Sequence, residues 1–177
     1  IQTNRGCPFT CTFCHEGEKY YSAVNSFQVH RITEELNYIS DRLQGQSVLS
    51  IADSNFAMYK QDLEICKKIR EIQDTKGYPK FINVTTGKNK PEMILEAIKI
   101  LGEGTVYMSA SVQSLNSGVL ENIKRKNIEW TAYIDIQHRL HEIDPNYMSV
   151  SEIIVPLPGE TKESFFESIG KLIGVGI

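Results

Sequence analysis

The chain has 177 residues, of which 41% are hydrophobic and 23% are charged, and its formal net charge is −3. This length and composition fit one globular domain, which buries roughly 70% of the surface of its unfolded chain. The small negative charge excludes a general electrostatic attraction to nucleic acid or to an anionic membrane. The sequence shows no signal peptide and no long apolar segment. We therefore expect a protein of the reducing cytoplasm, with neither a membrane nor nucleic acid as a partner.

The hydrophobic pattern predicts strands that alternate with helices. Short apolar runs typical of buried parallel strands predict strands at 1–4, 47–52, 79–86, 105–109 and 148–155. Apolar residues at helical spacing predict helices at 29–43, 63–77, 91–101, 116–123, 129–143 and 161–173. Asn25 and Ser26 are candidate caps of the first helix, Pro91 is expected to begin the third, and Thr161 to cap the last.

This alternation predicts an α/β fold with a parallel sheet and right-handed crossovers. Ligands of such folds bind at the carboxyl ends of the strands. Unusual polar segments follow each predicted strand: the cysteine-containing loop, 53–55, 85–88, 109–113 and 156–160. We therefore expect these five segments to converge on one site.

Cys7, Cys11 and Cys14 form a C-x3-C-x2-C run just after the first predicted strand. Three thiolates on one short loop can each hold one iron of a cubane [4Fe–4S] cluster. Cys66, the remaining cysteine, lies on the apolar stripe of a predicted helix, where a cysteine behaves as a small core residue. We therefore predict a cluster held by Cys7, Cys11 and Cys14, with one iron open to a ligand that is not protein.

The cysteine run has two other interpretations. His15 could complete a zinc site in an interaction module, or the cysteines could belong to a disulfide scaffold. The sequence has no second short cysteine pair, and four cysteines are few for a disulfide-stabilised chain of 177 residues. The spacing favours the iron–sulfur cluster, and the zinc-binding module stays as the alternative.

The segment 3–14, TNRGCPFTCTFC, has an aromatic residue before its third cysteine and resembles the cluster loop of the radical S-adenosylmethionine (radical SAM) superfamily. The segments 51–56, 113–114, 122–127 and 157–161 resemble the subgroup whose members often carry a cobalamin-binding domain. The resemblance implies a partial (β/α)6 barrel similar to a TIM barrel, of which this chain supplies about five βα units. We therefore expect residues 1–177 to be a radical SAM core domain cut from a longer chain, without its upstream and downstream domains.

The resemblance also implies the cofactors and the chemistry. SAM would bind the open iron, and its reductive cleavage would release a 5′-deoxyadenosyl radical that abstracts hydrogen from an unknown small-molecule substrate. An electron donor such as flavodoxin or ferredoxin would be needed. Methyl transfer and oxidoreductase-like reactions are both open, as is a scaffold that binds the cluster without cleaving SAM. Cobalamin is expected only in the full-length protein, because its Asp-x-His-x-x-Gly signature is absent here.

The same resemblance suggests which residues contact SAM. Phe13 would lie near the adenine, or else pack as a core aromatic under the loop. Asp53, Ser54 and Asn55 stand where many family members bind the SAM amino group with a Gly-Gly-Glu motif, or else form a polar turn that caps the next helix. Ser109, Ser111 and Gln113 could bind the ribose or the carboxylate of SAM. The run Lys124-Arg125-Lys126 is read as the solvated end of a helix.

Overall fold

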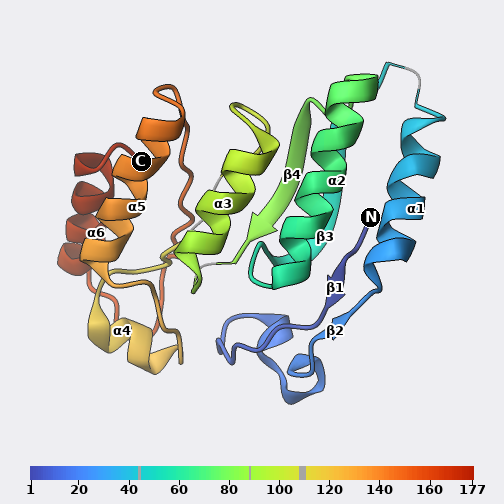
Figure 1. The fold of residues 1–177 in the computed structure, drawn as a ribbon. Helices are drawn as coiled ribbons and strands as arrows, with labels where there is room; N and C mark the ends of the chain where they lie inside the picture. Colours follow the sequence, from blue (N-terminus) through green and yellow to red (C-terminus); the bar gives the residue numbers. More distant parts are fainter. Residues whose placement is uncertain (44, 88, 108–110) are drawn as a thin grey trace.

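The chain folds as an α/β protein in a computed structural model that describes residues 1–43, 45–87, 89–107 and 111–177. Its strands are β1 (Asn4–Arg5), β2 (Asn25–Ser26), β3 (Val48–Phe56) and β4 (Phe81–Thr86). Its α-helices are α1 (Val29–Ser40), α2 (Lys60–Lys76), α3 (Pro91–Leu101), α4 (Ser117–Asn122), α5 (Trp130–Ile143) and α6 (Lys162–Gly174). Figure 1 shows the long helices in chain order across the molecule, from α1 at one side to α6 at the other.

The sheet is parallel, as the alternation predicts. β3 and β4 pair in parallel from Val48 opposite Phe81 to Ile51 opposite Val84. The N-terminal residues lie on the other side of β3, where the Ala52 N–H donates to the Ile1 carbonyl over 2.9 Å. The strand order therefore follows the chain order through the first three predicted strands.

The fourth and fifth predicted strands do not form regular ladders in the part of the chain that the structure describes. Each is represented there by an isolated parallel bridge, Ile82 to Val106 and Gln113 to Ile153. The fifth segment lies at an edge, and its Met148, Val150 and Val155 side chains are at least half exposed. An edge segment has hydrogen-bonding partners on one side only, which weakens its pairing compared with a central strand.

Helices cover one face of the sheet and form the core with it. β3 alternates, so that Leu49 and Ile51 are buried under the helices while Ser50 and Ala52 face the opposite side. The buried stripes of α2 and α3 complete this core with Ile65, Ile69, Ile72, Ile94, Ile98 and Leu101. Cys66 is fully buried among them, and burial raises the pKa of its thiol, so the prediction of a small core residue is confirmed.

The helix ends follow the sequence signals with one exception. α3 begins at Pro91, and Thr161 caps α6 by accepting the Ser164 N–H over 3.1 Å. The prediction that Asn25 or Ser26 caps the first helix is wrong. Both residues form β2, which pairs antiparallel with β1, and α1 begins only at Val29. Among the described residues, the helices are all too short or too polar to cross a membrane.

Candidate cluster and cofactor site

A cavity of about 720 Å³ opens at the carboxyl ends of the strands, where the cysteine loop, β3 and β4 meet. Figure 1 shows that the cysteine loop and α4 lie together on the side toward which β4 points. The lining comes from four of the five polar segments expected to converge: Cys7, Cys11, Cys14, Asp53, Ser54, Asn55, Thr85, Thr86, Ser111 and Gln113. Arg125 and Glu152 also line the cavity, whereas none of the residues 156–160, the fifth segment expected to converge, is among the described lining residues.

The cysteine loop is a tight turn that depends on two glycines. Gly6 has φ +104°, and a Cβ there would lie 2.4 Å from the Ala23 carbonyl oxygen. A Cβ on Gly17 would lie 2.2 Å from the carbonyl oxygen of Cys11. Both contacts are too close for any side chain, so glycine is required for the chain to fold back beside the cysteines.

Two of the three cysteine sulfurs already have hydrogen-bond donors. The Asn55 side-chain amide donates to Cys7 Sγ over 3.3 Å, and the Arg125 guanidinium donates to Cys11 Sγ over 3.8 Å. Cys14 is exposed and lines the same cavity. Donors directed at sulfur stabilise thiolates, which are the form that binds iron.

The donor set of three cysteine thiols suits a [4Fe–4S] cluster, because soft sulfur ligands suit iron–sulfur chemistry. A cubane spreads its irons over separate corners, so its cysteine ligands need not meet at one point. His15, the expected fourth zinc ligand, instead has its Nε2 2.7 Å from the Tyr21 hydroxyl. This geometry favours the cluster reading of the cysteine run over the zinc reading.

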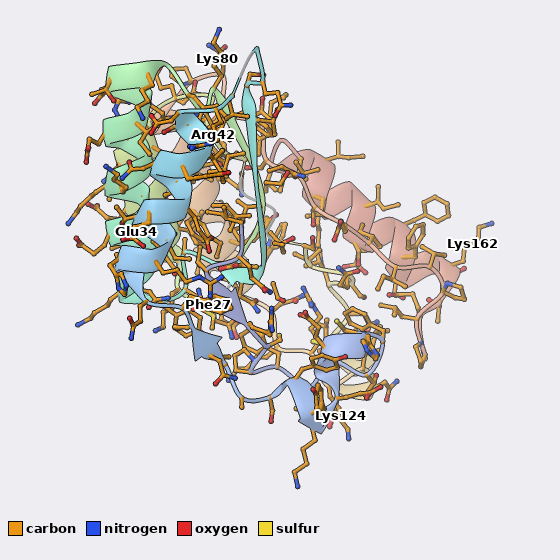
Figure 2. All side chains as sticks on the ribbon, turned by 90° about the vertical axis from the view of Figure 1, so that its right-hand side faces the viewer. Phe27, Glu34, Arg42, Lys80, Lys124 and Lys162 are labelled. Carbon is orange, nitrogen blue, oxygen red and sulfur yellow. The ribbon has the colours of Figure 1, made fainter. Side chains whose placement is uncertain are left out.

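Arg125 is a site residue that the sequence analysis missed. The prediction that Lys124-Arg125-Lys126 is a solvated helix end holds for the two lysines, which are exposed, but is wrong for Arg125, which is only 7% exposed. After α4, Lys124 adopts φ +51°, and the Arg125 N–H donates back to the Leu120 carbonyl over 2.9 Å. This Schellman-type end turns Arg125 inward and leaves its neighbours in solvent. Figure 2 shows Lys124 projecting from the end of the molecule that carries the cysteine loop.

The environment of Arg125 combines burial with a negative partner. Burial lowers the pKa of the guanidinium, and the neighbouring Cys11 thiolate acts in the opposite direction. The guanidinium carbon lies 5.7 Å from the centre of the Phe13 ring, within cation–π range. Phe13 itself is 37% exposed in the cavity wall, so the alternative that it packs as a core aromatic is wrong.

Asp53 lines the cavity, but its carboxylate is occupied. It accepts the Thr3 N–H over 2.7 Å and the Asn4 N–H over 3.0 Å, together with the Thr3 hydroxyl and the Asn4 amide. Asp53, Ser54 and Asn55 belong to β3, so the alternative that they form a turn capping α2 is also wrong. Asp62 takes that role by accepting the Met58 and Tyr59 N–H groups.

Two residues that line the cavity have buried polar atoms without partners among the described residues: the Gln113 side-chain carbonyl and the Thr86 hydroxyl. Their residues are only 6% and 4% exposed, and Gln113 also has the unusual φ of +64°. Buried polar atoms are nearly always hydrogen-bonded, so both atoms have unused hydrogen-bonding capacity beside this cavity. Ser111 nearby donates to Glu152 over 3.0 Å. Ser109 lies outside the described residues.

Comparison with known families identifies the class of protein. The radical SAM superfamily pattern matches residues 1–172, so this chain belongs to the radical SAM superfamily. The family recognised from the cysteine loop is thereby confirmed.

The chain is also similar in sequence to individual methyltransferases and to a methylthiotransferase. The chain is 34% identical over 99% of its length to the 2-(S-pantetheinyl)-carbapenam-3-carboxylate methyltransferase of Streptantibioticus cattleyicolor. It is 33% identical, over the same share, to the cobalamin-dependent radical SAM methyltransferase TokK of Streptomyces tokunonensis. It spans 25% of the length of each of these two relatives. The threonylcarbamoyladenosine tRNA methylthiotransferase MtaB of Thermotoga maritima is more distant, at 24% identity over 93% of this chain and 38% of that protein.

Solved structures confirm the fold. The radical SAM methyltransferase TsrM of Kitasatospora setae, with cobalamin and a [4Fe–4S] cluster bound, superimposes with a TM-score of 0.77 at 15% identity. That match covers 99% of this chain and 32% of TsrM. Methylornithine synthase, PylB, gives a TM-score of 0.65 at 14% identity, over 99% of this chain and 49% of PylB. The α/β arrangement is therefore the partial, TIM-like barrel of the superfamily.

Proposed function

We propose that this chain is the radical SAM domain of a methyltransferase, in which Cys7, Cys11 and Cys14 hold a [4Fe–4S] cluster beside bound SAM. The observation that carries the proposal is the shared cavity: all three cysteines line it, and so do Thr86 and Gln113, whose side-chain oxygens have no partner in the part of the chain that the structure describes. When bound, the cluster supplies the electron that cleaves SAM into methionine and a 5′-deoxyadenosyl radical, which abstracts hydrogen from the substrate.

The residues of this chain orient the ligands. Asn55 and Arg125 direct hydrogen-bond donors at the sulfurs of Cys7 and Cys11. The Gln113 carbonyl accepts a hydrogen bond from a hydroxyl or amine of SAM, and the Thr86 hydroxyl can donate or accept one. Phe13 presents its partly exposed ring to the adenine. Ser54, Ser109 and Ser111 stay as predicted contacts of SAM.

The relatives support methyl transfer to a small molecule as the reaction of the whole protein. Two of them, at 34% and 33% identity, are methyltransferases, and one is named as cobalamin-dependent. We accordingly place cobalamin in a part of the full-length protein outside this chain, and a flavodoxin or ferredoxin as electron donor. The net charge of −3 gives no support for a nucleic-acid substrate. A reducing, cytoplasmic setting suits a cluster held by free thiols.

The experiment uses the full-length protein, purified and reconstituted without oxygen. We expect about four irons and four sulfides per chain, and 5′-deoxyadenosine on addition of SAM and dithionite. Cys11→Ala should lose both the iron and the product. Cys66→Ala is the matched control, because Cys66 is buried in the core away from the cavity, and it should keep both.

Two results would contradict the proposal and support one of the alternative functions. Zinc bound in place of iron and sulfide would support the interaction module. A complete cluster that never yields 5′-deoxyadenosine would support a scaffold without SAM cleavage.

A further inference from the structure

The chain returns to the cysteine loop just after α4 and contacts it at two neighbouring points. The Thr12 N–H donates to the Ile123 carbonyl over 3.0 Å, and Arg125 donates to Cys11 Sγ over 3.8 Å. Cys11 and Arg125 are 114 positions apart in the sequence. The turn after α4 therefore holds the middle of the cysteine loop through both its backbone and a charged side chain.

The guanidinium of Arg125 is held by hydrogen bonds within the protein. Its Nε donates to Asn127 Oδ1 over 2.9 Å, and its Nη2 donates to the carbonyl of Ser111. Asn127 is in turn held by the carbonyls of Val112 and Ser114, at 2.8 and 3.0 Å. The orientation of the remaining Nη1 toward Cys11 is thus set without any ligand. Such a preorganised contact loses little side-chain entropy when the ligand binds.

The position combines charge with burial. Arg125 is a buried cation, while Lys124 and Lys126 on either side of it are exposed. An exposed charge is screened by water and salt, whereas a buried one acts at much lower effective dielectric. Of the three consecutive cations, Arg125 therefore acts most strongly on a charge at Cys11.

We propose that Arg125 is a positioning residue that sets the reduction potential of the cluster through its contact with Cys11, an inference that rests on the proposed function. Reduction transfers one electron from a low-potential donor to the cluster, and no bond to Arg125 forms or breaks. The added negative charge strengthens the attraction to a fixed cation. Hydrogen bonds to the sulfurs and nearby net charge are among the factors that set the potentials of iron–sulfur clusters. Arg125 consequently raises the potential and makes the cluster easier to reduce.

The test is a redox titration of the reconstituted full-length protein in the absence of SAM. Dithionite is the reductant, mediators set the potential, and the electron paramagnetic resonance signal of the reduced cluster is the readout. In Arg125→Gln we expect the ratio of reduced to oxidised cluster at a fixed potential to fall about tenfold, which corresponds to about 59 mV for a one-electron couple. In Arg125→Lys we expect a fall of about threefold, since a lysine cannot satisfy Cys11, Ser111 and Asn127 at once.

Lys126→Gln is the matched control. It removes the same formal charge one residue away, from an exposed side chain. Screening should limit its effect on the ratio to less than about twofold. Iron content and thermal unfolding are measured for every variant, so that a change in potential is compared only between fully loaded proteins.

The proposal is overturned if Arg125→Gln carries a complete cluster and titrates like Lys126→Gln. It is also overturned if a shift appears only after SAM is added, because Arg125 then acts on SAM. If Arg125→Gln does not retain the cluster, Arg125→Lys decides, and a wild-type potential in that variant refutes the inference. A wild-type protein that forms no cluster, or that forms one and does not cleave SAM, counts against the proposed function instead.

Discussion

Asp53 is a cavity residue whose role is to hold the chain that leads into the cysteine loop. Its carboxylate accepts four hydrogen bonds from Thr3 and Asn4. A carboxylate offers about four lone-pair sites, and these four hydrogen bonds use all of them in this structure. The sequence gives no signal for these hydrogen bonds, because their donors lie about fifty positions away.

Substitution of Asp53 should therefore reduce stability. Asp53→Asn removes the buried charge and places an amide N–H₂ among donors. We expect the free energy of unfolding to fall by about 2–3 kcal/mol, measured by urea unfolding followed by circular dichroism. Asp74→Asn is the control at an exposed ion pair with Arg70, and we expect a change within about 0.5 kcal/mol. Unchanged stability of Asp53→Asn together with loss of SAM binding would instead assign Asp53 to the ligand.

Arg125 shows why part of the site was hidden from the sequence. The cysteine spacing alone indicates its chemistry, because the ligands are close together in the chain. Arg125 stands between two lysines, which is the composition of a solvated helix end, and its burial follows from the left-handed conformation of Lys124. A positive φ at a lysine is uncommon and has no signal in the residue types around it.

At the scale of elements, the helices were predictable and the regularity of the last two predicted strands was not. Spacing of apolar residues, together with Pro91 and Gly77, places α2 and α3 almost as observed. The segments at 105–109 and 148–155 have the composition of strands, but the structure gives each only an isolated bridge among its described residues. Strand formation depends on neighbours in space, which residue composition does not reveal.

The conformation of the cysteine loop depends on the absence of a side chain at Gly17. Gly17→Ala would place a Cβ against the Cys11 carbonyl. The loop must therefore shift at Cys11, which lines the cavity. We expect this variant to bind less than half of the iron of the wild type after anaerobic reconstitution. Gly170→Ala in α6 is the matched control, since its Cβ meets nothing within 4 Å. It should keep the iron and stabilise the protein by about 0.5–1 kcal/mol. Full iron loading of Gly17→Ala would show that the loop can adjust.

At the scale of the whole molecule, two regions with different anchoring meet at the cavity. The core under α2 and α3 is closed by apolar packing, whereas the cysteine loop is held mainly by hydrogen bonds to β3 and to the turn after α4. Ligands that bind only the folded state stabilise the parts they contact. The cluster should therefore stabilise the cysteine loop more than it stabilises the apolar core under α2 and α3.

Removal of the cluster tests whether the cysteine loop depends on it more than the core does. We expect amide hydrogen exchange in the chelator-treated, full-length protein to accelerate at 5–17 and 120–127, while α2 and α3 keep their protection. Mass spectrometry of peptic fragments measures both regions in one experiment. Uniform acceleration over the whole chain would instead mean that the core and the cysteine loop unfold as one unit.

The contact between Cys11 and Arg125 also has a consequence for biosynthesis. The ribosome releases the cysteines long before it makes the turn after α4, because 114 positions separate the two partners. A nascent chain thus carries its thiols on an unsupported loop for most of the translation of this domain. The hydrogen bond that Arg125 donates to Cys11 can therefore form only after nearly three quarters of this domain has been synthesised.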